Sequence, residues 1–177
     1  MKKTSKKVNA AIIIIGNEIL SGRTQDVNVV HLSKWLNELG VKVEEVRVIP
    51  DIENSIVNTV NELRKKFKYV FTTGGIGPTH DDITSRSIAK AFNVSYGYNK
   101  DAYETLEKYY KPGEFNDGRK KMAKMPDKAS LIYNPSSGAP GFVVENVYCF
   151  DFFLFYKIYN LFCTIANQIF FGRSHNY

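Results

Sequence analysis

Cysteine is scarce in this sequence, and outside the N-terminus basic residues barely outnumber acidic ones. Only two cysteines occur, Cys149 and Cys163, and their spacing matches no metal-binding motif. A pair of this kind is typical of reduced thiols in a cytoplasmic protein. The formal net charge of +6 includes four lysines among the first eight residues, and subtracting their four charges leaves +2 for the rest. So small an excess disfavours nucleic acid as a partner.

The sequence also lacks internal repeats, linker-like segments and a clear membrane span. The apolar run from Ala10 to Ile15 is short and is followed by Gly-Asn-Glu rather than a cleavage site, so it predicts a buried strand, not a signal peptide. The aromatic stretch 150–171 approaches the length of a transmembrane helix, but Asp151, Lys157 and several amides make a membrane anchor the weaker interpretation. We predict one domain at residues 9–148, between a basic tail at 1–8 and an atypical aromatic-rich tail at 149–177.

Strand and helix patterns alternate three times within the first hundred residues. Runs of β-branched residues without polar alternation are typical of parallel strands covered on both faces, and apolar residues at helical spacing indicate helices between them. The predicted elements are strands at 8–15, 41–49 and 69–73, and helices at 25–39, from a cap at Asp51 or Asn54 to Phe67, and at 82–92. This order predicts an α/β fold, a three-layer α/β/α sandwich with a mostly parallel central sheet. Less regular patterns follow, with helices predicted at 100–110 and 116–124 and strands at 131–133 and 142–144.

A glycine-rich turn joins the third predicted strand to the next helix. Gly74, Gly75 and Gly77 let the backbone approach a ligand closely, and the start of a helix offers unpaired N–H groups to an anion. No Gly-Lys-Ser/Thr follows, which excludes a Walker loop, and His80 occupies the position of the third glycine in the dinucleotide-binding fingerprint. The glycines alone fit a tight turn without a ligand equally well.

Carboxylates accompany this turn. Asp81 and Asp82 are adjacent, and because two carboxylates repel phosphate, we predict a divalent cation between them and a bound phosphate. Thr79 joins the predicted phosphate cradle, although Thr79 and Asp82 also have capping-box spacing, so a plain helix cap is the alternative for Asp82. The loop at 16–24 and the residues after it add Glu18 and Asp26 at the same edge of the sheet. The alternative for Asp26 is an N-cap of the next helix.

A third loop, at 134–141, combines turn-forming residues with hydroxyl groups. Ser136, Ser137 and Gly138 are predicted to complete the pocket wall and bind the substrate, with a plain hairpin connection as the alternative. A basic run precedes this loop. Such a run is usually a solvated helix face, but one or two of its members could contact an anionic substrate, namely Arg119, Lys120, Lys121 and Lys124.

These three loops, in this order, resemble the molybdopterin-binding MogA/MoaB-like family, in the branch typified by the N-terminal domain of CinA-type (competence/damage-inducible) proteins. The matching segments are 16–22 with Asp26 and Asn28, then 73–84, then Asn116 with 121–126, and Asn134 with 138–142. The resemblance covers residues 9–148. From Cys149 onward the sequence departs from the family pattern as a shifted reading frame or a truncated gene would.

The resemblance implies a domain that is usually oligomeric and binds a molybdopterin or a nucleotide at these loops. For CinA-like members it implies a pyrophosphatase that uses a divalent cation (Mg²⁺, Mn²⁺ or Co²⁺) on a nucleotide such as ADP-ribose or FAD. By motif matching, Asp81 and Asp82 are metal or catalytic carboxylates, Glu18 and Asp26 lie across the cleft, and the phosphate cradle consists of Gly74, Gly75, Gly77 and Thr79. The alternatives are molybdopterin adenylylation, as in MogA-related members, and a pterin- or nucleotide-binding module without catalysis.

Overall fold

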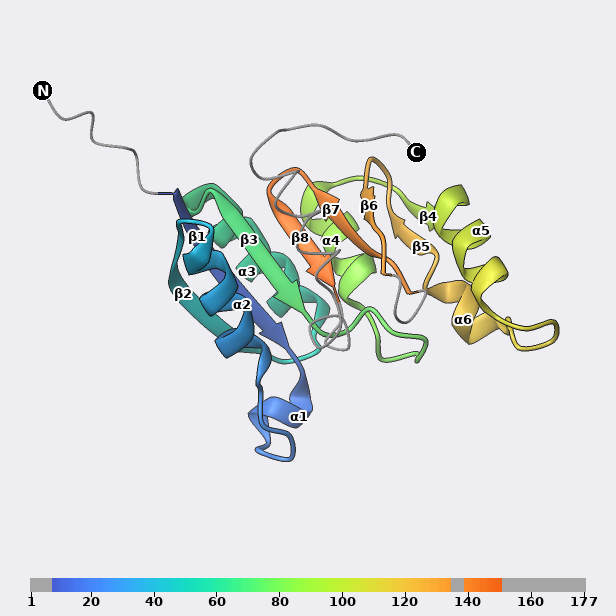
Figure 1. The fold of residues 1–177 in the computed structure, drawn as a ribbon, viewed down its shortest axis with the longest axis horizontal. Coiled ribbons are helices and arrows are strands. Elements are labelled where there is room, and N and C mark those ends of the chain that lie inside the picture. Colours follow the sequence, from blue (N-terminus) through green and yellow to red (C-terminus); the bar gives the residue numbers. More distant parts are fainter. Residues whose placement is uncertain (1–7, 135–138, 151–177) are drawn as a thin grey trace, which may run out of the picture.

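A six-stranded sheet with the strand order β2-β1-β3-β8-β7-β6 forms the centre of the protein (Figure 1). The computed structural model describes residues 8–134 and 139–150. Four of the strands are parallel, namely β1 (Val8–Ile15), β2 (Val41–Ile49), β3 (Tyr69–Thr73) and β8 (Val147–Phe150). Two antiparallel strands complete the sheet, β7 (Gly141–Val144) and β6 (Ser130–Ile132). The predicted α/β fold with a mostly parallel sheet is confirmed.

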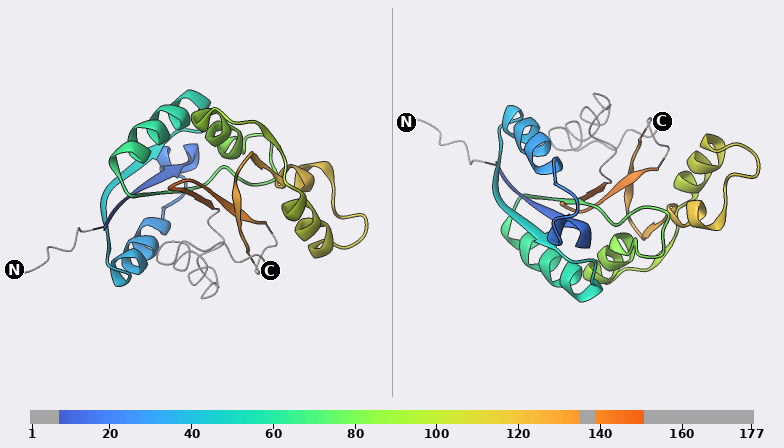
Figure 2. Two further views of the ribbon diagram at one scale, coloured as in Figure 1. Left: turned by 90° about the horizontal axis from the view of Figure 1, so that it is seen from above. Right: turned by 90° about the horizontal axis from the view of Figure 1, so that it is seen from below.

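Helices cover both faces of the sheet (Figure 2). Side chains alternate along β1, so its odd-numbered residues from Ala11 to Ile15 join the core on one face and its even-numbered ones from Ala10 to Ile14 join the core on the other. α2 (Asn28–Glu38) packs on the second face, whereas α3 (Glu53–Lys66) and α4 (Thr84–Phe92) pack on the first. This packing buries β1 completely from Ala10 to Ile15 and fixes the loops at its end.

A smaller unit lies beside the sheet and is formed by the part of the chain that follows α4 and precedes β6. It contains the antiparallel strands β4 (Tyr96–Tyr98) and β5 (Lys124–Pro126) and the helices α5 (Lys100–Tyr109) and α6 (Asp117–Lys121). α6 begins as predicted, because the Asn116 side chain accepts a hydrogen bond from the Arg119 N–H at 3.0 Å. The helix predicted at 116–124 is too long, since the chain from Lys124 onward pairs with β4 instead.

The starts of three helices differ from the prediction, and an aspartate stands before each. In each case the residue after the aspartate occupies the N-cap position, and this residue is apolar and cannot cap the helix with its side chain. The N-cap residues are Val27 after Asp26, Ile52 after Asp51 and Ile83 after Asp82. The predicted cap of α3 by Asp51 or Asn54 is therefore wrong. α4 begins at Thr84 rather than at Asp82, because the Asp82 carboxylate turns back into the preceding loop.

Some predictions fall on residues that the structure does not describe. These are the basic tail before Val8, the loop residues Ser136, Ser137 and Gly138, and the aromatic-rich tail beyond Phe150. The boundary predicted between Tyr148 and Cys149 falls inside β8, all four residues of which are buried. Within the described ranges, no helix combines the length and the apolar character needed to cross a membrane.

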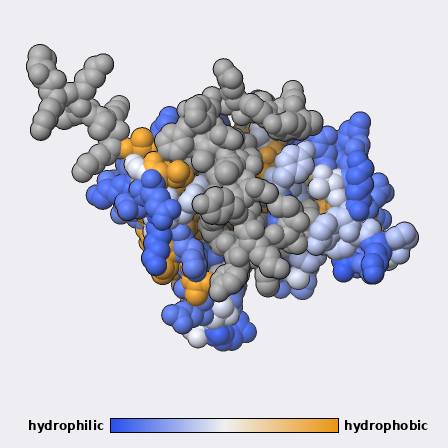
Figure 3. Space-filling view, viewed as in Figure 1, coloured by the Kyte–Doolittle hydropathy of each residue, from blue (hydrophilic) through white to orange (hydrophobic). Residues whose placement is uncertain are grey.

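β2 is an edge strand and leaves apolar side chains at the surface. Val46 and Val48 are 42% and 39% exposed on the face that carries α2, and Val30 of α2 is 52% exposed (Figure 3). Scattered exposed valines are common on protein surfaces. The homo-oligomer implied by the resemblance therefore stays a prediction.

Candidate functional site

The carboxyl ends of the parallel strands meet at one edge of the sheet. β1, β2 and β3 are followed there by connections at 16–27, 50–52 and 74–83 (Figure 1). The first of these contains a short helix, α1 (Asn17–Leu20), which the sequence analysis missed because one helical turn carries no periodicity. Ligands of open α/β sheets bind at this edge. Every predicted site residue that the structure describes lies in the first or the third connection.

The glycine loop after β3 lies directly against the end of β1. Gly74 has a φ of 95°, and a Cβ atom added to it would lie 2.1 Å from the carbonyl oxygen of Ile15. Gly75 has a φ of 70°, and its added Cβ would lie 2.2 Å from Thr84 Oγ1. The Thr84 hydroxyl, itself fully buried, donates a hydrogen bond to the Gly74 carbonyl at 2.9 Å. Both positions therefore require glycine, which fixes the path of the loop.

The two adjacent aspartates have different surroundings. Asp82 Oδ2 accepts hydrogen bonds from the backbone N–H of Thr79 at 2.7 Å and from its hydroxyl at 2.6 Å. A Cβ on Gly77 would lie 2.8 Å from the same oxygen, so the loop folds closely around this carboxylate. Asp81 instead has an 80% exposed side chain, 3.1 Å from His80 Nε2. The plain helix cap considered for Asp82 is wrong, since the capping-box bond to Thr79 forms inside the loop and α4 starts later.

Asp51 is a site residue that the sequence analysis missed. Its Oδ2 atom accepts a hydrogen bond from the Asn17 N–H of α1 at 2.8 Å. Burial raises the pKa of Asp51, and the nearby negative charges of Glu18 and Asp82 raise it further. Carboxylates from all three connections thus interact at this edge. The available signal is the position of Asp51 just after β2, from which only Pro50 separates it, but the same position also predicts a helix cap.

Asp26 and Glu18 differ in their surroundings, as Asp82 and Asp81 do: the first of each pair is hydrogen-bonded and the second is exposed. Asp26 stands one residue before the N-cap position of α2, and its Oδ1 atom accepts the Val29 N–H at 3.0 Å, which holds the first turn of that helix. Glu18 lies exposed on α1. Within residues 8–134 and 139–150, no three His, Cys, Asp or Glu side chains are placed so that they could hold a metal ion together. The four predicted metal ligands therefore form no protein-only cage for a cation.

Two buried polar atoms lie at the same edge without partners among the described residues. They are Oδ1 of Asn28, in the first turn of α2, and Oγ1 of Thr73, at the end of β3. Asn28 is 5% exposed and Thr73 is 1% exposed. A buried polar atom without a hydrogen bond is costly. Both atoms are thus suited to a ligand group that would satisfy them.

The third loop connects neighbouring antiparallel strands. β6 pairs with β7 from Ile132 opposite Gly141 onward, so the loop at 134–141 closes a hairpin, the alternative left open by the sequence. Its predicted substrate-binding residues Ser136, Ser137 and Gly138 lie outside the described residues. Their proposed contacts stay a prediction.

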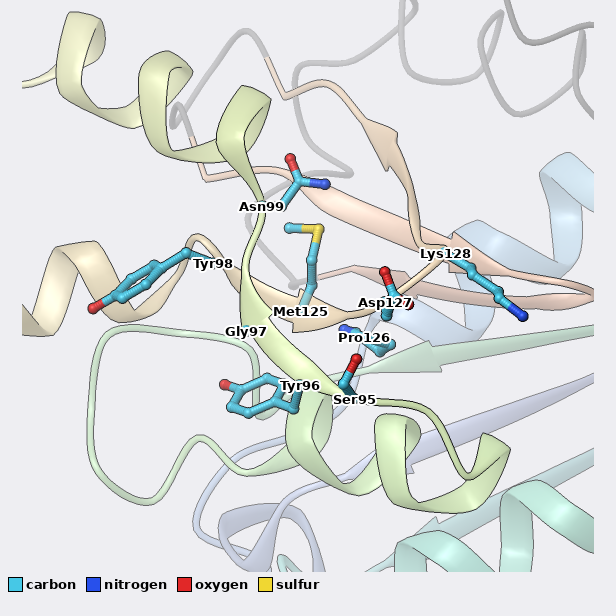
Figure 4. Close-up of a pocket in the computed structure, with 9 residues that line it drawn as sticks. All are labelled: Ser95, Tyr96, Gly97, Tyr98, Asn99, Met125, Pro126, Asp127 and Lys128. Carbon is cyan, nitrogen blue, oxygen red and sulfur yellow. The ribbon is translucent and has the colours of Figure 1, made fainter.

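A cavity of about 250 Å³ lies apart from these loops, at the pair of β4 and β5 (Figure 4). It is lined by Ser95, Tyr96, Gly97, Tyr98, Asn99, Met125, Pro126, Asp127 and Lys128. None of these residues belongs to the connections after β1, β2 or β3. The perturbed carboxylate and the glycine loop therefore identify the candidate site better than this cavity does.

Comparison with known sequences identifies relatives over most of the chain. A model of the family described as "Probable molybdopterin binding domain" matches residues 11–158. A curated protein of Archaeoglobus fulgidus is 40% identical over 136 residues, which are 77% of this chain and 58% of that protein. One of Sulfolobus acidocaldarius is 44% identical over 138 residues, which are 76% of this chain and 52% of its own length. The chain spans about half the length of these curated relatives.

Solved structures of similar fold include two archaeal proteins. CinA from Thermoplasma acidophilum, described as having unknown function, is 32% identical with a TM-score of 0.75, over 81% of this chain and 87% of that one. The tungsten cofactor synthesizing protein MoaB from Pyrococcus furiosus is 20% identical with a TM-score of 0.56, over 93% and 94% of the two chains. The second likeness concerns the fold alone.

Proposed function

Since the chain belongs to the molybdopterin-binding MogA/MoaB-like family, in its CinA branch, we propose that it is a metal-dependent pyrophosphatase for a nucleotide. ADP-ribose and FAD represent the substrate class, in which two phosphates are joined by a bridging oxygen. Water adds to one phosphorus, the bridging P–O bond breaks, and two phosphate monoesters leave. The site lies at the connections after β1, β2 and β3.

The observation that carries this proposal is the set of interacting carboxylates beside a glycine loop. The negative charges of Glu18 and Asp82 help to raise the pKa of Asp51, so the three carboxylates interact although they belong to different connections. Like charges gathered in this way cost free energy unless something offsets them. A cation that arrives with a phosphate ligand offsets them, and a carboxylate with a perturbed pKa, such as that of Asp51, is typical of functional sites.

The residues present fit a magnesium-like ion that is shared with a ligand. Such an ion is usually bound by one or two carboxylates and completes its octahedral shell with phosphate oxygens and water. Both bonds from Thr79 end on Oδ2 of Asp82, which leaves Oδ1 for the ion, with Asp51 or Asp81 as a second ligand. When bound, Mg²⁺, Mn²⁺ or Co²⁺ polarises a phosphoryl oxygen and lowers the pKa of the attacking water.

The chain's own residues position the substrate. Gly74, Gly75 and Gly77 keep the loop free of side chains, so that its backbone can approach a phosphate. Asn28 and Thr73 offer buried polar atoms to the rest of the ligand, a pterin or a nucleoside. These features support binding as well as catalysis, so the experiment has to separate the two.

The test is hydrolysis of ADP-ribose and FAD by the purified chain with Mg²⁺, Mn²⁺ or Co²⁺. We expect Asp82→Asn and Asp51→Asn each to lower turnover at least about a hundredfold. Asp101→Asn, an exposed position on α5, is the matched control and should leave turnover unchanged. Turnover that is indifferent to Asp82→Asn contradicts the assigned role.

Two further outcomes point to the alternatives. Binding of these nucleotides without turnover under any of the three cations would indicate a non-catalytic module. An adenylylated product from molybdopterin and ATP, with no hydrolysis of ADP-ribose or FAD, would indicate molybdopterin adenylylation.

A further inference from the structure

α6 lies against the glycine loop, although 42 residues separate Thr79 from Lys121 in the sequence. The Lys121 ammonium donates a hydrogen bond to the Thr79 carbonyl. A Cβ on Gly118 of α6 would lie 3.1 Å from the Pro78 carbonyl oxygen, so the helix backbone approaches the loop closely as well. The smaller unit beside the sheet therefore reaches the candidate site through α6.

The structure distinguishes Lys121 from its basic neighbours. Sequence patterns left open which members of the basic run contact an anionic substrate. Lys121 is the member whose ammonium is bound to the glycine loop. The other three have partners elsewhere: Arg119 lies over the Tyr110 ring at 4.2 Å, Lys120 binds Asp117 at 3.2 Å, and Lys124 lies over the Tyr98 ring at 4.7 Å.

Both negatively and positively charged side chains surround the Lys121 ammonium. It is partly buried, and this burial lowers its pKa, while the carboxylates of Asp82 and Asp81 raise it and the positive charges of Arg86 and Lys124 lower it. An ammonium carries three N–H donors, of which the Thr79 carbonyl takes one. A partly desolvated ammonium with remaining donors, placed beside a glycine loop, is suited to bind an anion.

The charge balance of the site calls for such a cation. Glu18, Asp51, Asp81 and Asp82 bring four carboxylates to this edge. One divalent ion offsets two of these charges, and a diphosphate adds more negative charge. Without a further positive group, repulsion would oppose binding of the ligand.

Building on the proposed function, we propose that Lys121 binds the ligand's diphosphate directly. Its ammonium holds the Thr79 carbonyl with one donor and a phosphate oxygen with another. The diphosphate is thereby held between a lysine from α6 and a metal ion on the loops of the sheet. This arrangement favours ligands with a doubly charged phosphate group over neutral nucleosides.

The test measures binding of inorganic pyrophosphate with Mg²⁺ to the full chain by calorimetry. We expect Lys121→Met to weaken binding at least about tenfold. Lys121→Gln keeps a donor for the Thr79 carbonyl without the charge and should bind as weakly as Lys121→Met. Lys121→Arg keeps the charge and should restore most of the affinity.

Lys120→Met is the matched control, because Lys120 is the adjacent residue and binds Asp117 rather than the loop. It should bind pyrophosphate as the parent chain does. Thermal unfolding of every variant shows whether the fold survives. Parent-like affinity of Lys121→Gln would overturn the proposal, since it would mean that Lys121 only supports the loop. A parent chain that hydrolyses ADP-ribose or FAD but binds no pyrophosphate would overturn this proposal alone, whereas absence of hydrolysis would count against the proposed function.

Discussion

Asp82 holds its loop together through one oxygen of its carboxylate. Its Oδ2 atom accepts two hydrogen bonds from Thr79, whereas the side chain of Asp81 is 80% exposed. The adjacent residues therefore share a motif without sharing a structural role. Their contributions to folding can be separated by substitution.

We expect Asp82→Ala to lower the free energy of unfolding by about 1–2 kcal/mol, because the Thr79 N–H and hydroxyl lose their acceptor. Asp81→Ala should change it by less than about 0.5 kcal/mol, as is usual for an exposed side chain. Urea unfolding of the two variants beside the parent chain measures both values. Equal effects would mean that the loop is not closed by Asp82.

Gly75 offers a test of the close approach between the loop and α4. It shares its left-handed backbone with Gly22, since the two φ values are 70° and 71°. A Cβ at Gly22 meets nothing within 4 Å, but one at Gly75 would lie 2.2 Å from Thr84 Oγ1. Gly22→Ala should cost about 1 kcal/mol for the backbone conformation alone, and Gly75→Ala about 3 kcal/mol. Similar losses in thermal unfolding would show that the loop adjusts freely.

Asp51 is expected to favour function at the expense of stability. Burial and the negative charges of Glu18 and Asp82 raise the pKa of Asp51 in the folded protein, so ionisation of this carboxyl favours the unfolded chain over the folded one. Asp51→Asn keeps an acceptor for the Asn17 N–H and removes the charge. We expect its Tm to rise by about 2 °C, while binding of pyrophosphate with Mg²⁺ becomes weaker. A fall in Tm would indicate that the carboxylate is stabilising.

Among the elements, β1, β2 and β3 have the predicted bounds and β6 and β7 lie within one residue of the predicted ones, whereas β4 and β5 could not be predicted. The bounds of β1, β2 and β3 are as predicted, since β1 and β3 lie buried in the sheet and β2 ends at Pro50. β4 and β5 have three residues each and depend on pairing with one another across the chain. These two strands carry too little pattern of their own.

The helix starts were the other weak point, and they explain how part of the site was missed. An aspartate before a helix is usually read as a cap. Asp51 and Asp82 instead bind Asn17 and Thr79 in the loops, and apolar residues occupy the N-cap positions. The glycine loop could be predicted because glycine has few other reasons to recur there. The hydrogen-bond partners of a carboxylate depend on the fold, so they could not be predicted from the sequence.

β8 permits a direct test of where the domain ends. Sequence patterns predict that the domain ends before Cys149, yet that residue pairs with Thr72 and Phe142 inside the sheet and is fully buried. We expect iodoacetamide to alkylate Cys149 at pH 8 at least about a hundredfold more slowly in the native chain than in urea. Mass spectrometry of the Cys149 peptide distinguishes it from Cys163. Rapid native labelling would mean that β8 is not formed.

At the scale of the whole molecule, the sheet's carboxyl edge collects groups from both parts of the structure. The sheet supplies the glycine loop and Asp51, and the smaller unit supplies Lys121. The site therefore depends on how the two parts pack. Since the chain spans about half the length of its curated relatives, the activities of those whole proteins are not assumed for it.

The stability of the whole molecule should fall in alkaline solution, because two titratable groups are buried in the centre of the sheet. Burial raises the pKa of the Cys149 thiol from 9.0 to about 12 and that of the Tyr148 phenol from 10.0 to about 12. Both groups are neutral below these values and must lose a proton to become charged. A folded pKa above the unfolded one means that unfolding releases protons once the pH exceeds the unfolded pKa.

The free energy of unfolding should therefore be nearly constant from pH 7 to about 9 as far as these two groups are concerned, and then decrease. Each group contributes a slope of at most about 1.4 kcal/mol per pH unit until the pH reaches its folded pKa. Urea unfolding between pH 7 and 10.5 measures this decrease in the parent chain and in Cys149→Ala. The variant lacks one of the two groups, so its free energy of unfolding should fall less steeply above pH 9. At pH 7 this free energy should be lower in the variant than in the parent chain. Parallel curves would show that the Cys149 thiol ionises as easily in the folded chain as in the unfolded one.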